Sequence, residues 1–339
     1  MRLFASIDVG SNTLRLLIAA FANGTLVDVY ADRKVTRLGA GVEETGMLRS
    51  EAMTSSLLVL SDFASAIRRH GVKHVKTIAT SALREAGNAD SFISMVRQKT
   101  GLDIEVVTGE REAALTLRGI LFGLPRGIGD MHAPMTGRPQ YADTGLRQPT
   151  FFVMDIGGGS SEWIIYQGEE RILMGSIPTG VIKLTRRCVT TDPISRDDLL
   201  LLGRETENAL SPLLQYRQKL MSGRTIFLGT GGTFTSLASV DLALDTYERE
   251  KIHMRRIPFS RLAKMHDTFV AVPRAERAKT PGLEPERADL ILPGLHFTMK
   301  VMKLFHFSEL VVSDYGLLEG AILEMKEAIE KNLPEAVES

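Results

Sequence analysis

Two stretches of the chain repeat one pattern: an apolar run, an Asp-x-Gly turn, a second apolar run and a further glycine turn. The first is FASIDVGSNTLRLLIAAFANG, with Asp8 and Gly10, and the second begins VMDIGGGSSEWIIY, with Asp155 and Gly157. Glycine permits tight turns and lets another group approach the backbone closely, and Asn-Gly between apolar runs favours a hairpin. The repeat predicts two related lobes whose loops face each other across a cleft. Two unrelated strand–turn–strand units are the alternative.

The glycine loops suggest a binding site for anions. Successive backbone amides in such a turn can form an anion-binding concavity. A carboxylate beside that concavity would repel a bare anion, so the pattern predicts a phosphate site that is assisted by a metal ion. A third loop, in RTIFLGTGGTFTSLASV, places Gly229, Gly231 and Gly232 where a helix N-terminus could meet a phosphate. A tight strand-to-helix turn is the alternative for this third loop.

The segments between the loops alternate between strand and helix patterns, which favours α/β architecture. Leu124 to Pro149 breaks the alternation, with four prolines and four glycines, and is interpreted as a long loop or flexible insertion. From 241 to 308 the chain is expected to be helical. The other expected elements are strands at 74–80, 102–107 and 172–177, helices at 51–70, 89–100, 111–122, 182–188 and 195–221, and a strand, turn and helix over 309–329.

Composition narrows the class of protein. The 339 residues are enough for about two domains, and 44% of them are hydrophobic, which supports substantial cores. Lys plus Arg and Asp plus Glu both total 41, so the chain lacks the bulk charge of a strongly basic nucleic-acid binder. Cys188 is the only cysteine, which fits a reducing compartment. No apolar run reaches membrane-spanning length. These features predict a cytoplasmic protein that binds neither nucleic acid nor membrane.

Taken together, the motifs resemble those of the exopolyphosphatase and guanosine-pentaphosphate phosphohydrolase (Ppx/GppA) family, within the actin-like ATPase superfamily. The match spans nearly the whole chain, and the ordered set is more specific than any single motif. The matching segments are IDVGSNTLRLLI at 7–18, ATSALREAGN at 79–88, VTGEREAAL at 107–115, MDIGGGSSE at 154–162, LGTGGTFTSLA at 228–238, LILPGL at 290–295 and SDYGLLEGAIL at 313–323.

The resemblance implies an α/β fold with two actin-like (ribonuclease H-like) lobes around a central phosphate-binding cleft. Lobe I would cover 1–121, with a C-terminal helix at 320–339 packing back on it. Lobe II would cover 122–319 and include the insertion at 124–149. The chain resembles the short two-domain form of the family, whose members commonly form homodimers.

Glu112 is the expected catalytic base. It stands at the start of a predicted helix that follows a strand, where a carboxylate could orient water, and it matches the position that the family uses as its base. The alternative is a helix-start Glu favoured by the helix dipole. Arg111 departs from the family, which often has another Glu at that position.

Asp155 and Glu162 are the expected metal ligands, because Mg²⁺ prefers oxygen ligands and often uses one or two carboxylates with substrate phosphates. Mg²⁺ or another divalent cation is therefore the expected cofactor. Arg84 is expected to bridge two phosphate oxygens with its planar guanidinium, although a surface ion pair is the alternative, and Arg37 is a weaker candidate. The other expected phosphate-binding residues are Asp8, Ser11, Asn12, Gly157, Gly158, Gly231, Gly232 and Thr233.

The resulting hypothesis is an exopolyphosphatase that hydrolyses terminal orthophosphate from inorganic polyphosphate by Mg-assisted in-line attack of a Glu-activated water. Hydrolysis of guanosine pentaphosphate at its 5′ end is the close alternative. An actin-like ATPase or kinase, and a non-catalytic polyphosphate or alarmone sensor, are more distant ones. Basic segments at 68–76 and 249–264 are candidate tracks for a polyanion.

Overall fold

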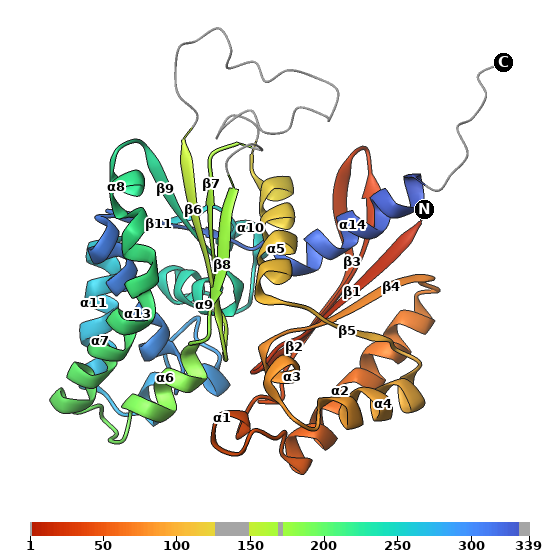
Figure 1. The fold of residues 1–339 in the computed structure, drawn as a ribbon, viewed down its shortest axis with the longest axis horizontal. Coiled ribbons are helices and arrows are strands. Elements are labelled where there is room, and N and C mark those ends of the chain that lie inside the picture. Colours follow the sequence, from red (N-terminus) through yellow and green to blue (C-terminus); the bar gives the residue numbers. More distant parts are fainter. Residues whose placement is uncertain (1, 126–148, 169–171, 332–339) are drawn as a thin grey trace, which may run out of the picture. The chain divides into compact units, whose positions relative to one another are not determined.

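The computed structural model describes residues 2–125, 149–168 and 172–331 (Figure 1). The chain divides into two compact units, Met1–Gly119 with Gly316–Ser339 and Ile120–Tyr315. The division expected from the sequence placed the boundaries after residues 121 and 319. The expected insertion at 124–149 lies outside the described residues, except for positions 124, 125 and 149.

The first unit contains a five-stranded sheet in the order β3-β2-β1-β4-β5. Its strands are β1 (Leu3–Val9), β2 (Thr13–Ala22), β3 (Thr25–Val35), β4 (His74–Ala79) and β5 (Ile104–Val106). β1, β2 and β3 form consecutive antiparallel hairpins, whereas β4 runs parallel to β1 and β5 runs parallel to β4. The β2–β3 turn is Asn23-Gly24, with φ values of 50° and 77°, so the predicted Asn-Gly hairpin is confirmed.

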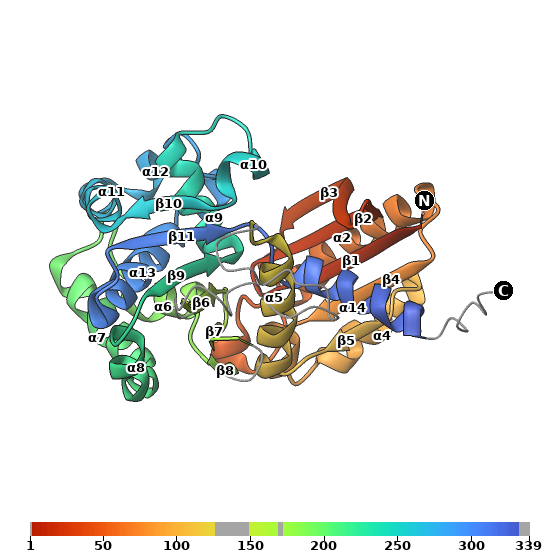
Figure 2. The ribbon, with the colours of Figure 1, turned by 90° about the horizontal axis from the view of Figure 1, so that it is seen from above.

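Helices cover both faces of this sheet (Figure 2). The helices of the unit are α1 (Val42–Thr45), α2 (Ser50–Arg69), α3 (Ser81–Glu85), α4 (Ala89–Thr100), α5 (Gly109–Gly123) and α14 (Leu317–Lys331). Alternate residues of β1, including Ile7 and Val9, share a core with Phe63 of α2 and Phe92 of α4. Ile78 belongs to a separate cluster with residues of α5 and α14, so these two helices pack on the other face.

The contact between α5 and α14 depends on two glycines, which have no side chain to separate the helices. A Cβ on Gly320 would overlap the Leu115 carbonyl and lie 2.7 Å from its carbon, and a Cβ on Gly119 would lie 2.8 Å from the carbonyl carbon of Gly316. Glu324 of α14 pairs with Arg111 of α5. α5 is therefore held against α14 by close backbone packing and by charge.

The second unit repeats the topology of the first. Its sheet has the order β10-β11-β9-β6-β7-β8, where β6, β7 and β8 form antiparallel hairpins and β9 and β11 add parallel strands. Removing the edge strand β10 leaves the arrangement of the first sheet, so the prediction of two related α/β lobes is confirmed. The strands are β6 (Thr150–Ile156), β7 (Ser161–Tyr166), β8 (Ile172–Ile177), β9 (Thr225–Thr230), β10 (Arg255–Pro258) and β11 (Glu309–Ser313).

Two expectations for this unit are wrong. The stretch 241–308 is not all helical, because β10 pairs antiparallel with β11 and buries Ile257 between exposed neighbours. The helix expected over 195–221 is interrupted by the 3₁₀ turn Ser211–Tyr216, where Pro212 has no N–H to continue an α-helix. The helices are α6 (Val181–Cys188), α7 (Arg196–Leu210), α8 (Arg217–Met221), α9 (Gly231–Leu242), α10 (Arg249–Ile252), α11 (Phe259–Ala271), α12 (Arg274–Arg277) and α13 (Ile291–Phe305), with a second 3₁₀ turn at Pro285–Arg287.

A pair of histidines packs between α11 and α13. The Nε2 atom of His266 lies 3.2 Å from Nδ1 of His296. Burial, followed by the charges of His266, Lys300 and Lys303, lowers the pKa of His296 to about 4, against an opposing effect of Glu207. Burial also lowers the pKa of His266. Both imidazoles are therefore neutral in the folded protein at pH values where they would be protonated in the unfolded chain.

The pair makes stability depend on pH. Below pH 6.5 the unfolded chain takes up a proton at position 296 that the folded protein accepts only near pH 4, so stability falls across this window as pH falls. We expect the free energy of unfolding to fall by about 3 kcal/mol between pH 6.5 and pH 4 from His296 alone. Urea unfolding at several pH values should show a smaller loss in His296→Gln than in the wild type. His306→Asn, at an exposed position, should keep the wild-type slope; equal slopes in all three proteins would contradict the assignment.

No helix in residues 2–125, 149–168 and 172–331 is long and apolar enough to cross a membrane.

Candidate active site

A row of oxygen-bearing side chains crosses the second sheet. Asp155 on β6 pairs in register with Glu162 on β7, and Glu162 pairs with Ser176 on β8. Register partners project from the same face of a sheet, and the Ser176 hydroxyl donates a 2.7 Å hydrogen bond to Oε1 of Glu162. Glu162 is 2% exposed. Two carboxylates on neighbouring strands with this burial favour a cation, because like charges directly opposite are otherwise destabilising.

The equivalent pair in the first unit joins an acidic and a basic side chain instead of two carboxylates. Asp8 occupies the sixth position of the seven-residue strand β1, as Asp155 does in β6, but its register partner is Arg15. Arg15 donates to Oδ2 of Asp8 from Nε at 3.0 Å and from Nη2 at 2.6 Å. Oδ1 of Asp8 is buried without a hydrogen-bond partner in the described part of the chain. The carboxylate of Asp8 is thus neutralised within its own unit, and Arg15, which sequence analysis missed, supplies the positive charge at this loop.

The loop after β6 is held by the start of α6. The amides of Val181 and Ile182 donate to the carbonyls of Gly157 and Gly158, both at 2.9 Å. The C=O and N–H groups of a planar trans peptide point in opposite directions, so the amides of Gly158 and Gly159 point away from α6. The amide of Gly157 instead donates to the Ser160 carbonyl at 3.0 Å. The Gly157 amide is therefore used within the loop and the Gly158 amide is directed away from α6, and phosphate binding by backbone amides near Gly157 and Gly158 stays a prediction.

The third glycine loop lies at the N-terminus of α9. Gly231 has φ of +80°, and a Cβ there would overlap the carboxylate of Asp155. A Cβ on Gly232 would lie 2.5 Å from Nη2 and 2.8 Å from Cζ of Arg287. The loop therefore brings together a carboxylate, a guanidinium and the first amides of a twelve-residue helix. Arg287 was also missed, because its signal is contact with a residue 55 positions earlier in the chain rather than a local motif.

Thr233 joins two loops in this unit. Its hydroxyl donates a 2.7 Å hydrogen bond to the carbonyl of Ile156, at the end of β6, and its methyl group would be 2.6 Å from a Cβ on Gly294. A threonine hydroxyl has one proton to donate. In this structure that proton is used within the unit and fixes the third loop against the second, and donation from Thr233 to a phosphate stays a prediction.

The loop after β1 is braced by the segment that follows β3. The amide of Gly39 donates to the Ser11 carbonyl at 2.8 Å, and the amide of Arg37 donates to the Asn12 carbonyl at 2.9 Å. The Ser11 hydroxyl lies 3.1 Å from that of Ser81, the first residue of α3. Oδ1 of Asn12 is buried with no hydrogen-bond partner among the described residues. Arg37 has φ of +53°, so the side chain of this weaker candidate leaves from a strained backbone position.

Arg84 and Glu112 form a pair in the first unit. Nη1 of Arg84 donates to the Val107 carbonyl at 2.7 Å and lies 3.4 Å from Oε2 of Glu112. Nε and Nη2 of Arg84 make no hydrogen bond to residues in the described ranges, so this fork of the guanidinium is available to an oxyanion. Glu112 lies in the first turn of α5 and is 8% exposed. Arg111, which departs from the family pattern, instead contacts Glu324 of α14.

The candidate polyanion tracks are less basic than their sequences indicate. In the segment 249–264, the arginines at 249, 255, 256 and 261 pair with the acids at 314, 241, 309 and 241, and Lys251 pairs with Glu248. In the segment 68–76, Lys76 pairs with Glu105 and Glu324. These ion pairs weaken the interpretation of 249–264 as a track, whereas in 68–76 the ion pairs among described residues involve only Lys76.

Asp155 and Glu162 are the two candidate metal ligands. No cluster of three or more His, Cys, Asp or Glu side chains that could hold a metal ion occurs in residues 2–125, 149–168 and 172–331. A pair of carboxylates is nevertheless the donor set that Mg²⁺ uses when waters and substrate phosphates complete its coordination. The residues at 155 and 162 therefore fit a magnesium ion that binds together with substrate, and they do not form a closed protein cage.

Two α/β units of one topology, each with an Asp-x-Gly loop at the end of its first strand, define an actin-like phosphate-handling protein. The chain belongs to the Ppx/GppA phosphatase family, whose model matches residues 17–128 and 143–328.

Individual proteins give the same placement. The chain is 30% identical over 335 residues to Exopolyphosphatase 2 of Mycobacterium tuberculosis, covering 95% of this chain and 98% of that protein. It is 26% identical to a guanosine-5′-triphosphate,3′-diphosphate pyrophosphatase of Vibrio vulnificus, covering 95% of this chain but 59% of that protein. The crystal structure of an exopolyphosphatase from Cytophaga hutchinsonii superposes with a TM-score of 0.82 at 28% identity, covering 96% of this chain and 98% of that one.

Proposed function

We propose that the protein is an exopolyphosphatase that releases terminal orthophosphate from inorganic polyphosphate. The observation that carries the proposal is the Arg84–Glu112 pair. In it a buried carboxylate lies beside a guanidinium whose Nε and Nη2 can donate to an oxyanion. The similarity to an exopolyphosphatase over 98% of that protein's length supports the same substrate class.

The roles follow from the chemistry of the side chains. Glu112 would accept a hydrogen bond from the attacking water and then its proton, since a carboxylate is a suitable general base. Arg84 would bind two oxygens of the phosphoryl group through Nε and Nη2. The amides of Gly158 and Gly159, the start of α9 and the Arg287 guanidinium would hold further phosphate oxygens.

Asp155 and Glu162 would hold Mg²⁺, which when bound would neutralise charge on the phosphate chain. Oε1 of Glu162 accepts from Ser176, so this hydrogen bond would orient the carboxylate. Asp155 lies against Gly231 at the N-terminus of α9, which would place its negative charge beside the phosphate-binding amides.

Removal of the 5′-terminal phosphate of guanosine pentaphosphate is the second candidate, favoured by the similarity to the Vibrio protein. Polyphosphate ranks first because the chain spans nearly the full length of the mycobacterial protein and only 59% of the Vibrio one. Homodimer formation and a cytoplasmic location stay predictions, whichever of the two substrates is correct.

A phosphate-release assay tests the proposal. With Mg²⁺ present, the wild-type protein should release orthophosphate from long-chain polyphosphate with a higher kcat/KM than from guanosine pentaphosphate or ATP. A higher kcat/KM for guanosine pentaphosphate would favour the second candidate. Release from ATP alone would assign the protein to the nucleotide hydrolases, and tight polyphosphate binding with no release would make it a sensor.

Metal removal should abolish hydrolysis. We expect EDTA to stop orthophosphate release and added Mg²⁺ to restore it. Asp155→Asn should raise the Mg²⁺ concentration needed for half-maximal rate by about tenfold or more, because it removes one charged oxygen ligand. Asp197→Asn, at an exposed position in the same unit, is the matched control and should titrate as the wild type does. Full activity in EDTA, or an unchanged Mg²⁺ requirement in Asp155→Asn, would contradict the metal assignment.

A further inference from the structure

Arg287 contacts the phosphate loop from a segment that runs beside α9. At one end of this segment Gly282, with φ of +85°, packs so closely on α9 that a Cβ there would lie 2.5 Å from the carbonyl carbon of Ser239. Near the other end Arg287 meets Gly232, seven residues earlier on the same helix. Arg287 is 9% exposed, and its Nε donates to Oε2 of Glu284 at 2.8 Å. The guanidinium at the loop is therefore placed by the course of the backbone between residues 282 and 288.

A second arginine fixes the end of that segment. Arg277 is the last residue of α12 and is 3% exposed. Its Nε donates to the carbonyl of Ala288, the residue after Arg287, at 3.2 Å. Its Nη1 donates to the carbonyls of Phe269 at 2.9 Å and Val272 at 3.2 Å. One guanidinium thus joins the end of α11 to the turn that carries Arg287.

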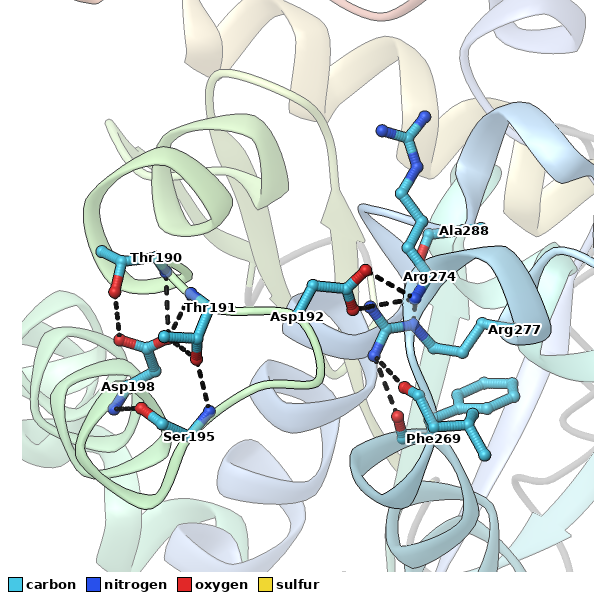
Figure 3. A network of polar contacts seen from close by, with 10 residues as sticks. Thr190, Thr191, Asp192, Ser195, Asp198, Phe269, Arg274, Arg277 and Ala288 are labelled. Atoms are coloured by element: carbon cyan, nitrogen blue, oxygen red, sulfur yellow. Dashed lines mark hydrogen bonds and ion pairs between the residues drawn. The ribbon is translucent and has the colours of Figure 1, made fainter.

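The charge of Arg277 is balanced from a separate loop (Figure 3). Oδ1 of Asp192 lies 3.4 Å from Nη2 of Arg277. Both oxygens of Asp192 also accept from the amide of Arg274, at 2.8 and 3.0 Å. Burial is the largest influence on the pKa of Arg277 and lowers it, while Asp192 opposes the shift. A buried charge is retained at low cost only when it is paired and hydrogen-bonded, and here it is both.

The loop that carries Asp192 is itself anchored. Asp198 accepts hydrogen bonds from the amides and hydroxyls of Thr190 and Thr191, at 2.8 to 2.9 Å (Figure 3). Burial raises the pKa of Asp198, but these hydrogen bonds outweigh it and lower the pKa to about 2. The carboxylate that faces Arg277 therefore comes from an ordered loop.

We propose that Arg277 is a positioning residue for phosphate binding: through the Ala288 carbonyl it sets where the Arg287 guanidinium lies on Gly232, without touching the substrate itself. This inference rests on the proposed function, because it assigns Arg287 to the phosphate chain. Lysine cannot replace Arg277 in this role, since an ammonium lacks the planar fork that reaches three carbonyls and a carboxylate at once.

The test is a double-mutant cycle on orthophosphate release from tripolyphosphate with Mg²⁺, using Arg277→Lys, Arg287→Lys and the double variant. We expect each single substitution to raise KM about tenfold with kcat within about twofold, because it displaces or removes a substrate-positioning group. The double variant should resemble Arg287→Lys alone, since Arg277 acts through Arg287. Arg118→Lys is the matched control, because Arg118 is also an ion-paired arginine, bound to Glu324 and Glu327 of a neighbouring helix. The KM of this control should stay within about twofold of the wild-type value, even if the substitution lowers Tm.

A merely structural Arg277 would give a different result. The positioning role would be overturned if the KM increases of the two single variants multiply in the double variant. It would also be overturned if Arg277→Lys leaves KM unchanged. Both outcomes count even if the wild type hydrolyses tripolyphosphate. If Arg277→Lys does not fold, Asp192→Asn takes its place in the cycle, with an expected rise in KM of about threefold and the same lack of additivity. If the wild type releases no orthophosphate, the proposed function fails. The double-mutant cycle is then measured on the Kd for tripolyphosphate, determined by calorimetry. Absence of binding there would overturn both proposals.

Discussion

Glu112→Gln is expected to lower the turnover of polyphosphate by about a hundred- to ten-thousandfold, the usual contribution of a general base. The amide keeps the size of the side chain and removes its ability to accept a proton. Arg84 should stay in place, because its 2.7 Å hydrogen bond to the Val107 carbonyl does not involve Glu112. We therefore expect a folded protein with nearly unchanged KM and greatly reduced kcat in the orthophosphate-release assay.

Glu110→Gln is the matched control for this experiment. Glu110 lies in the same first turn of α5 but is exposed, so its substitution should leave kcat unchanged. Near wild-type turnover in Glu112→Gln combined with an inactive Glu110 variant would move the base to position 110. Full activity in both variants would remove the base from this helix.

Gly320→Ala is expected to be among the most destabilising single-methyl additions to this chain. The added Cβ would overlap the Leu115 carbonyl, and this oxygen belongs to the backbone of α5, so it cannot move aside as the end of a flexible side chain would. Overpacking of this kind costs about 3 kcal/mol, which corresponds to a fall in Tm of about 10 °C for a unit of this size. Differential scanning calorimetry measures the change, and activity should fall with it because α5 also carries Glu112.

Gly203→Ala provides the control with the same chemical change. Gly203 lies inside α7, where the nearest atom to an added Cβ is Nε2 of His296 at 3.6 Å, an ordinary contact distance. Since alanine favours a helix over glycine by about 1 kcal/mol, this variant should be as stable as the wild type or more stable. A similar loss of Tm in both variants would show that the α5–α14 contact is not the cause.

The fold was predictable where the sequence repeats a local pattern. The Asp-x-Gly turn at Asp8 and Asp155 marks strand ends, and the hairpins around them follow from alternating apolar runs and glycine turns, so the repeated topology could be inferred. The stretch 195–221 was expected to be one helix, but Pro212 lies within it and a 3₁₀ turn forms there. β10 was missed because four residues with one buried apolar side chain give too short a pattern.

The candidate site was less predictable, because its decisive contacts join distant parts of the chain. The sequence indicated Arg84 and Glu112 separately, but only the fold shows that they are neighbours. The motif containing Thr233 did not reveal that its hydroxyl is used by Ile156. Arg287 stands in no glycine loop, and its place beside Gly232 arises from packing along α9.

The position of α14 has a consequence for the order in which the protein is completed during synthesis. α14 supplies Leu317 and Ala321 to the cluster around Ile78 and Glu324 to Arg111, yet it follows the entire second unit in the chain. A ribosome therefore releases β1 to β5 and α5 long before the helix that covers them, while the strands and helices between Ile120 and Tyr315 emerge as one uninterrupted stretch. The first unit must wait, with Ile78 and Leu115 uncovered, until the second has been made. Apolar surface of this kind is what chaperones bind on nascent chains, so the first unit is the one expected to need their protection.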